Sequence, residues 1–226
     1  GKKCTLIGDK SLSKRPMRRI SDPLNNWGAK ISLREDKYPP IEIAESKLQS
    51  KFSYELEIPS AQIKSCLLLA ALSSKTKIEI IEKIPSRDHT ERLLQECDAE
   101  IFRDGNKIIF DGAKGITKKF IDVPKDFSSA AYLIAANILM KRDIPLIGIG
   151  VNKTRTAFLD VLEEMGAKIE LHNDCIISNE QRADITVSSN KNLEGISISG
   201  QRIPNLIDEI PLIAIMAMFA EGKTII

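Results

Sequence analysis

One pattern occurs three times along the chain and restricts the folds that the chain can adopt. Each copy is a stretch with apolar residues at helical spacing, followed by Gly-Ala-Lys-Ile or a close relative of it. The copies span residues 15–31, 88–101 and 156–169. Their aligned alanines, Ala29, Ala99 and Ala167, are 70 and 68 positions apart. This period is too long for a solenoid, so the pattern predicts a repeated supersecondary unit.

The amphipathic helix of each copy is predicted to end at a residue with a left-handed backbone. Gly28 and Gly166 occupy this position in the first and third copies, where a left-handed C-cap favours glycine. Asp98 replaces glycine in the middle copy, and aspartate is one of the few other residues that tolerate this conformation. Two β-runs follow the cap, most clearly at residues 100–103 and 107–110 around Asp-Gly-Asn, which predicts a hairpin.

A second class of helix is small and apolar. The three predicted helices of this class span residues 61–72, 128–140 and 206–220. Alanine and leucine on nearly every face indicate that they are buried on several sides. The β-rich runs that follow them span residues 77–81, 144–150 and 224–226. The repeat therefore predicts an α/β protein in which helices pack inward against sheets.

Composition excludes several classes of function. Lys and Arg total 33 against 31 for Asp and Glu, and a net charge of +2 gives no global field that would select nucleic acid or a membrane surface. The longest apolar stretch, residues 210–220, contains a proline and is about half of what a membrane span needs. Four cysteines without a CxxC pair and only two histidines make a metal site unexpected.

The two ends of the sequence predict that the chain is an internal piece of a longer protein. The first seven residues contain neither a start Met nor the apolar core of a signal peptide, and the last five resemble an interrupted strand. Reduced cysteines fit a cytoplasmic protein. A change in composition around residues 121–125 predicts a linker, so we expect two domains, residues 1–123 and 124–226.

A basic segment at residues 10–19 contains five cations and two serines and is predicted to start a helix, with Pro16 in its first turn. Helix N-termini offer unpaired N–H groups, and arginine adds a bidentate fork, so Arg15 and its neighbours suit a phosphate or a carboxylate. Taken alone, the segment is more typical of a solvated basic surface. No aromatic residue interleaves the charges, which argues against nucleic acid.

The run PSAQIKS at residues 59–65 stands at the start of an apolar helix. Ser60 is predicted to cap that helix, and the cap alone would explain this serine. Gln62 is harder to explain, because a polar residue that enters an apolar helix needs a partner or a ligand.

The run SRDHTER at residues 86–92 resembles a capping box, with Asp88 as the cap and Glu91 three residues later. Arg87 directly precedes the cap and can point to the same mouth as the helix N-termini described above. His89 is predicted to be a surface residue of the first turn rather than a catalyst.

Two acids, Asp208 and Glu209, lie inside one of the most apolar stretches of the chain, residues 203–211. Burial of either carboxylate would be costly unless it were paired, and perturbed carboxylates are common in acid–base chemistry. The pattern does not choose between them. A carboxylate that caps a helix is an equally good interpretation.

Four runs in this order and spacing resemble the 5-enolpyruvylshikimate-3-phosphate synthases, in the branch common among bacteria that carries the SRDHTE sequence. The runs are GDKSLSKRPM at 8–17, SAQIKS at 60–65, SRDHTER at 86–92 and LIDEIP at 206–211. The resemblance covers the whole chain. It implies the enolpyruvyl transferase fold, which is α/β with repeated βαβαββ units and inward-packed helices in two domains, both incomplete here.

The resemblance implies an activity, substrates and residue roles. The enzymes of this family transfer the enolpyruvyl group of phosphoenolpyruvate to the 5-hydroxyl of shikimate 3-phosphate. By similarity, Ser60, Ala61, Gln62 and Arg87 would bind shikimate 3-phosphate, on the side of the first domain. The family uses no cofactor and no metal, and it implies a cytoplasmic monomer at full length.

By the same resemblance, Arg15 and Gln62 would bind phosphoenolpyruvate, and Asp208 would contact shikimate 3-phosphate as the acceptor of the 5-hydroxyl proton. Two polyanionic substrates must lie side by side, so arginines and helix N-termini are expected to offset their mutual repulsion. This assigns the proton acceptor to Asp208 rather than Glu209 by similarity alone.

The sequence also departs from the family. Lys125-Asp126 stands where the family has Gly-Asp at the crossing between domains, and Asp98 stands where the family has glycine. The family's first Gly-Asp-Lys-Ser segment, its Gly-Asn-Ser-Gly-Thr loop, its Lys-Glu-Ser/Thr-Asp-Arg motif and its later His-Arg pair have no counterpart. We therefore expect this piece alone to be inactive. A non-catalytic phosphate-binding half and a UDP-N-acetylglucosamine enolpyruvyl transferase are the alternatives.

Overall fold

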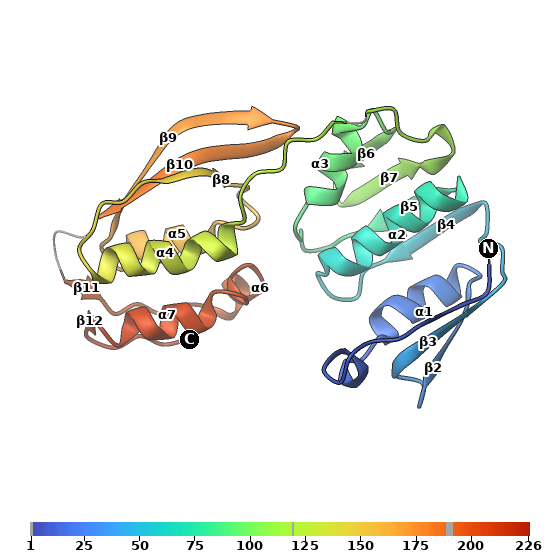
Figure 1. Cartoon of the computed structure of the whole chain (residues 1–226), viewed down its shortest axis with the longest axis horizontal. Coiled ribbons are helices and arrows are strands. Elements are labelled where there is room, and N and C mark those ends of the chain that lie inside the picture. Colours follow the sequence, from blue (N-terminus) through green and yellow to red (C-terminus); the bar gives the residue numbers. More distant parts are fainter. Residues whose placement is uncertain (1, 119, 189–191) are drawn as a thin grey trace. The chain divides into compact units, whose positions relative to one another are not determined.

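The computed structural model of the protein describes residues 2–118, 120–188 and 192–226 (Figure 1). The chain forms two compact units, Gly1–Lys119 and Phe120–Ile226, called unit 1 and unit 2 below. The domain division expected after residue 123 remains a prediction, because it concerns a longer protein. Each unit has its own apolar core.

Unit 1 contains two copies of the repeat. Its elements are β1 (Cys4–Leu6), the 3-10 turn η1 (Leu12–Lys14), α1 (Arg18–Asn26), β2 (Lys30–Arg34), β3 (Tyr38–Ala44), β4 (Lys51–Glu55), α2 (Ala61–Ser74), β5 (Lys77–Ile81), α3 (His89–Glu96), β6 (Ile101–Asp104), β7 (Lys107–Asp111) and the 3-10 turn η2 (Gly112–Lys114). The segment from β4 to β7 is a complete βαβαββ unit.

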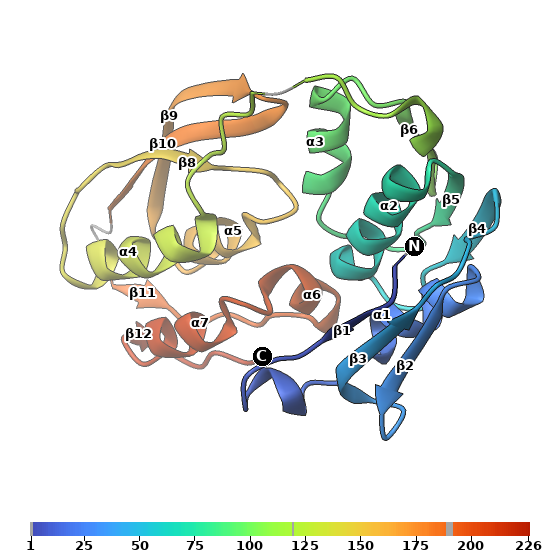
Figure 2. The same ribbon diagram turned by 45° about the vertical axis from the view of Figure 1, so that its right-hand side comes forward.

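The sheets of unit 1 share one strand order. The second sheet has the order β4-β5-β7-β6, in which β4 and β5 are parallel and the other pairs are antiparallel. The first sheet, β1-β3-β2, repeats the last three positions of that order with antiparallel pairs. Helices α2 and α3 lie side by side against the second sheet (Figure 2).

Unit 2 contains a third copy of the repeat and the start of another. Its elements are α4 (Phe127–Leu139), β8 (Leu146–Gly150), α5 (Ala157–Glu164), β9 (Lys168–Ile177), β10 (Glu180–Ser188), β11 (Leu193–Glu194), the 3-10 turn η3 (Gly200–Arg202), α6 (Ile203–Leu206), α7 (Ile210–Ala217) and β12 (Ala220–Glu221). The sheet β8-β10-β9 has the same order as β5-β7-β6. A single parallel bridge from Lys125 to Ile149 stands where unit 1 has the whole of β4.

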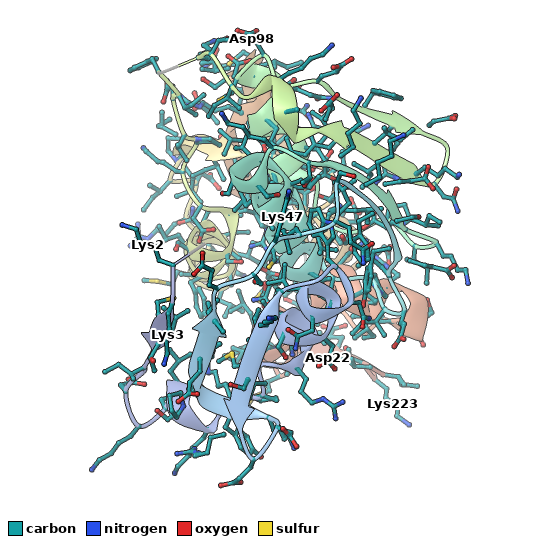
Figure 3. The ribbon with its side chains drawn as sticks, turned by 90° about the vertical axis from the view of Figure 1, so that its right-hand side faces the viewer. Lys2, Lys3, Asp22, Lys47, Asp98 and Lys223 are labelled. Carbon is teal, nitrogen blue, oxygen red and sulfur yellow. The ribbon has the colours of Figure 1, made fainter. Side chains whose placement is uncertain are left out.

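The three helix ends that the repeat predicts are confirmed. Gly28, Asp98 and Gly166 have φ angles of +109°, +57° and +95°, and Asp98 is labelled in Figure 3. In each copy the following alanine donates its backbone N–H to a carbonyl five residues earlier, at 2.9 Å. Glycine and aspartate therefore form the same cap, and the predicted hairpin after Asp98 is present as β6 and β7.

Buried apolar side chains explain why the helices pack inward. In unit 1, Leu67, Leu68, Ile78 and Phe110 are fully or almost fully buried between α2 and the sheet. Each contributes about 1.5–3 kcal/mol relative to an exposed side chain. The core of unit 2 centres on α4 and α5 and is also apolar.

The third apolar helix, predicted over residues 206–220, is wrong in extent. The structure has two shorter helices, α6 and α7, separated by residues 207–209. Pro211 lies in the first turn of α7, where its missing N–H removes no helical hydrogen bond, so it starts a new helix. The strand begins at Ala220 rather than residue 224, and Ile225 adds one bridge to Ser197.

The first amphipathic helix also starts later than predicted. Residues 12–14 form the turn η1, and Pro16 precedes α1, whose N-cap is Met17. The Met17 N–H donates to Lys37 O at 2.8 Å, which holds the chain outside the helix at this point. None of the helices in the described ranges is long and apolar enough to cross a membrane.

Candidate functional site

The N-terminus of α2 carries two of the predicted binding residues. The predicted cap is confirmed, because Ser60 has an extended backbone and its Oγ accepts from the Ile63 N–H at 3.4 Å. Ala61 opens the helix. Gln62 projects from the first turn, and its Oε1 accepts from Arg19 Nη1 at 3.0 Å. The partner that the sequence required for Gln62 is thus an arginine of α1.

Arg87 lies in the loop between β5 and α3, directly after a tightly held serine. The Ser86 N–H donates to Glu82 Oε1 at 2.8 Å, and the Ser86 hydroxyl donates to the same oxygen. Lys64 Nζ donates to Ser86 O at 3.4 Å. Arg87 itself is half-buried. The segment before Arg87 is therefore held by two buried charges, Lys64 in α2 and Glu82 directly after β5.

The predicted capping box is wrong. Asp88 is the N-cap residue of α3, but its side chain makes no capping hydrogen bond, and its Oδ2 accepts from Arg92 Nε at 2.8 Å. Glu91 turns into the protein instead, where its Oε1 lies 2.8 Å from Lys64 Nζ. A buried ammonium attracts this carboxylate more strongly than an exposed backbone N–H does. His89 is exposed, as predicted.

Lys64, Glu82 and Glu91 form a buried cluster that the sequence analysis missed, called the ion triad below. Lys64 and Glu82 have fully buried side chains, and Lys64 Nζ lies 3.2 Å from Glu82 Oε1. Glu82 Oε2 also accepts from Arg103 Nη2. Lys64, a charged residue at the fourth position of an apolar helix, was the available signal.

The two carboxylates of the ion triad differ in their pKa. Burial disfavours the charge of Glu82, but hydrogen bonds from Ser86 and Arg103 and the charge of Lys64 outweigh burial and lower its pKa. For Glu91, burial is the dominant cause and raises its pKa, although Lys64 offsets part of the effect. The Glu91 oxygens make no well-aligned hydrogen bond, so the close Lys64 ammonium acts mainly as a charge.

Arg15 was predicted to lie at the start of a helix, and the structure places it outside one. It is exposed and follows η1, three residues before α1 begins, so it does not stand at a helix start. Among the described residues, the structure gives no hydrogen bond or ion pair to its side chain. Between α1 and α2 lies an open cavity of about 510 Å³, lined in part by Arg18, Arg19 and Asp22. Asp22, labelled in Figure 3, accepts from Arg18 Nε at 3.2 Å.

In unit 2, Asp208 and Glu209 have different surroundings. Asp208 lies between α6 and α7 with its side chain 47% exposed, and its Oδ2 accepts from Arg155 Nη1 at 3.1 Å. Glu209 is buried and accepts from Ser128 Oγ at 2.6 Å. It occupies the N-cap position of α7 without a side-chain capping bond, so its interpretation as a helix cap is wrong. Of the two, Asp208 is the carboxylate that solvent can reach.

Arg155 is a second residue that the sequence analysis missed. Its side chain is 11% exposed, and it contacts Asp208, Ser128 Oγ and, at 4.0 Å, Glu209 Oε1. It directly precedes the N-cap residue of α5, as Arg87 directly precedes that of α3. The equivalent position of Arg87 in the repeat was the signal that could have predicted a role for Arg155. Within the described ranges, no group of three metal-binding side chains occurs.

Comparison with known proteins identifies the family. The family model described as EPSP synthase (3-phosphoshikimate 1-carboxyvinyltransferase) matches residues 1–226. The chain is 44% identical to the 3-phosphoshikimate 1-carboxyvinyltransferase of Brevibacillus brevis, over 97% of this chain and 51% of that protein. It is 45% identical to that of Thermoanaerobacter sp. strain X514, over 98% of this chain and 52% of that protein.

Solved structures agree with this result. EPSP synthase from Acinetobacter baumannii superposes with a TM-score of 0.83 at 37% identity, covering 99% of this chain and 51% of that one. The enolpyruvyl transferase NikO from Streptomyces tendae has a TM-score of 0.68 at 17% identity over 94% of this chain and 51% of that one, a likeness of fold alone. This chain thus spans about half the length of its relatives. Its fold and its match along the whole sequence show that it belongs to the EPSP synthase family.

Proposed function

We propose that the protein containing this chain transfers the enolpyruvyl group of phosphoenolpyruvate to the 5-hydroxyl of shikimate 3-phosphate. The products are 5-enolpyruvylshikimate 3-phosphate and phosphate, in the biosynthesis of chorismate and the aromatic amino acids. Family membership supports this proposal together with one observation on the site. In unit 1, the ion triad links the α2 end that carries Ser60 and Gln62 to the loop that carries Arg87.

Shikimate 3-phosphate is proposed to bind at the adjoining ends of α2 and α3. Ser60, Ala61 and Gln62 belong to the first turn of α2, and Arg87 directly precedes the N-cap of α3. A hydrogen bond of 2.6 Å between Ser65 and Thr90 joins these two helices close to the site. Helix N-termini and a guanidinium attract phosphate and hydroxyl groups, so this arrangement suits a phosphorylated polyol.

Phosphoenolpyruvate is proposed to bind Arg15 and Gln62. Gln62 already accepts a hydrogen bond from Arg19, and its amide N–H₂ group can donate to a ligand. Arg15 is exposed, so no internal salt bridge among the described residues has to break before it binds an anion. Arg19 lies next to the first turn of α2, and together with Arg15 it would offset the repulsion between the two substrates.

Asp208 is proposed to accept the proton of the 5-hydroxyl as that oxygen bonds to C2 of phosphoenolpyruvate. The C2–C3 double bond opens in this addition and C3 takes up a proton, and loss of a C3 proton together with phosphate then re-forms the double bond. Asp208 is accessible to solvent, and Arg155 orients its carboxylate at 3.1 Å. A carboxylate held in place by a guanidinium can act as a general base once water is excluded. The alternative acid, Glu209, is engaged with Ser128 in the interior.

We also propose that the full-length protein is a cytoplasmic monomer that requires no cofactor and binds neither nucleic acid nor membranes. The near-neutral charge balance of the chain supports the last point. A UDP-N-acetylglucosamine enolpyruvyl transferase is the second candidate, because a protein described as the enolpyruvyl transferase NikO has the same fold.

Calorimetric titration of the purified chain with shikimate 3-phosphate tests the binding half of this proposal. We expect binding that Arg87→Ala weakens at least about tenfold, because a phosphate loses a bidentate partner. Arg142→Ala is the matched control, since Arg142 is an exposed arginine in the turn after α4. Binding of UDP-N-acetylglucosamine in place of shikimate 3-phosphate would favour the second candidate. Equal affinity in the Arg87 variant would reject the assignment of Arg87.

A further inference from the structure

The ion triad connects two parts of the proposed binding site through one side chain. Lys64 belongs to the first turns of α2, where its backbone N–H donates to Ser60 O at 3.2 Å. Its ammonium reaches across to Glu82, which follows β5, and to Glu91, which lies in α3. Through Lys64, the position of the α2 N-terminus depends on two other elements of unit 1.

The same triad holds every polar group of Ser86. The amide N–H and the hydroxyl of Ser86 donate to Glu82 Oε1, and its carbonyl oxygen accepts from Lys64 Nζ. Arg87 is the next residue. The peptide group that joins it to Ser86 is held through the Ser86 carbonyl oxygen. A side chain of the α2 helix thereby fixes the backbone that carries Arg87.

Unit 2 shows that the repeat folds without such charges. Lys64 is four residues after the N-cap Ser60, and Ala130 is four residues after the N-cap Asp126. Ala130 is buried in the apolar core of unit 2. The position of the buried ammonium is therefore occupied by a methyl group in the other unit.

The two carboxylates have apolar counterparts as well. Glu82 and Val151 directly follow the equivalent strands β5 and β8. Their N–H groups donate to carbonyl oxygens near the start of the neighbouring strands β7 and β10, those of Asn106 at 2.8 Å and Gln181 at 2.9 Å. Glu91 and Leu159 both stand three residues after a helix N-cap. Val151 and Leu159 are both buried in the core of unit 2.

Buried ion pairs seldom stabilise a fold more than apolar residues of similar size do, because desolvation offsets their attraction. Buried hydrogen-bonded charges do restrict geometry, and sites gain from neighbours that lock their side chains. A charged triad in unit 1, where the repeat itself needs only apolar residues, therefore indicates a role other than holding the fold together.

We propose that Lys64, Glu82 and Glu91 are positioning residues, which fix Arg87 relative to Ser60 and Gln62 so that one phosphorylated ligand contacts both helix ends. This inference rests on the proposed function for the identity of the ligand. The geometric part, that the triad fixes Ser86 and Arg87, is independent of any ligand.

The test replaces the whole triad by apolar residues of similar volume, in the variant Lys64→Met/Glu82→Leu/Glu91→Leu of the full 226-residue chain. We expect an unchanged or raised melting temperature, because no buried charge is left uncompensated. Amide exchange of Ser86 and Arg87 without ligand should accelerate at least about tenfold. Affinity for shikimate 3-phosphate should fall by at least about tenfold.

A charge-matched control removes one cation and two anions from the surface of unit 1, in Lys107→Met/Glu79→Gln/Glu55→Gln. It should leave both exchange and affinity unchanged. Wild-type protection of Ser86, or wild-type affinity, in the triad variant would overturn the proposal. An unfolded triad variant would also overturn it, because the triad would then be needed for the fold.

A milder variant, Lys64→Met/Glu91→Leu, leaves Glu82 paired with Arg103 and with Ser86. It cuts the link from α2 to Ser86, and its affinity should fall at least about fivefold. Unchanged affinity in this folded variant would reject the proposal. If the wild-type chain binds no shikimate 3-phosphate, the half-site of the proposed function fails, whereas the exchange measurement still decides the positioning role.

Discussion

The two units share one repeat but differ in what binds the arginine before its second helix. In both, an arginine directly precedes the N-cap of the second helix, Arg87 in unit 1 and Arg155 in unit 2. In unit 2 this arginine binds the chain's own carboxylate, that of Asp208. In unit 1 we propose that the equivalent arginine binds a ligand anion. On this proposal, the residue before the second helix of the repeat binds an anion in both units, a carboxylate of the chain itself in unit 2 and a ligand in unit 1.

The buried residues at equivalent positions of the repeat also differ between the two units. Unit 1 places the ion triad behind its arginine, whereas unit 2 places Ala130, Val151 and Leu159 there. A loop that carries a ligand-binding arginine must keep its geometry without the ligand. In unit 2, Asp208 and Ser128 contact Arg155 directly and the buried Glu209 carboxylate lies 4.0 Å from it, so the positions that correspond to the triad are apolar.

The largest expected effect comes from breaking the triad at its centre. Lys64→Met alone leaves Glu91 buried without a cation, and Glu82 keeps only Arg103 and Ser86 as partners. Unit 1 should therefore lose about 3–5 kcal/mol of stability. Urea unfolding monitored by the fluorescence of Trp27, the single tryptophan and a core residue of unit 1, measures this change. The same method applied to Ala130→Gly should leave the Trp27 signal unaffected. A loss below about 1 kcal/mol for Lys64→Met would mean that the triad is not a coupled ionic cluster.

The next largest effect is expected in unit 2, from removal of the Arg155 side chain. Arg155→Ala removes charged hydrogen bonds to Asp208 and Ser128 and should destabilise unit 2 by about 2–3 kcal/mol. Thermal unfolding with hydrogen exchange of α4 measures it. Arg142→Ala in the same unit should change stability by less than about 0.5 kcal/mol. Equal losses of stability in the two variants would contradict the view that the bond between Arg155 and Asp208 stabilises unit 2.

A smaller effect concerns the caps that both units share. Gly166→Ala forces a side chain into a backbone with φ of +95° and should cost unit 2 about 1 kcal/mol. Gly166→Asn should cost less, because asparagine tolerates the left-handed region, as Asp98 does in unit 1. Gly200→Ala is the control, since a Cβ there meets open space. Chemical denaturation of the three variants separates these values.

The smallest effect is the pH dependence that the two carboxylates of the ion triad give to the stability of unit 1. The raised pKa of Glu91 means that its protonation favours the folded state, so stability rises as pH falls from that raised pKa towards the ordinary value of 4.5. The lowered pKa of Glu82 acts oppositely, because its contribution is lost as pH falls below 4.5 through its folded pKa. Unfolding of wild type and Glu91→Gln across this range measures both. A rise that persists in Glu91→Gln would assign it to another group.

Local patterns predicted the repeat because its signals lie within a few residues of each other. Gly28, Asp98 and Gly166 fix helix ends by their own backbone preferences, and the Asp-Gly-Asn turn fixes the hairpin. The Ser60 cap is equally local. Such features need no knowledge of what the chain packs against.

The errors arose where a distant residue competes with a local signal. Glu91 fits a capping box, yet Lys64, 27 positions earlier, attracts it into the interior. The role of Arg155 depends on Asp208, a partner 53 positions away. The break before α7 was different, because Pro211 signalled it locally. The ligand roles of Arg15, Ser60, Gln62, Arg87 and Asp208 came from resemblance and remain predictions.

The single bridge that replaces a strand in unit 2 has a consequence for solubility. Strand β8 pairs with β10 on one side, and on its other side Lys125 is the only bridging residue in the part of the chain that the structure describes, at Ile149. An open strand edge is a template for aggregation, and proteins protect such edges with proline and lysine. Pro124 lies against Gly150, within 3.2 Å of where a Cβ would stand, and Lys125 follows it. A proline and a lysine at this edge are expected to disfavour pairing of β8 with a strand of another molecule.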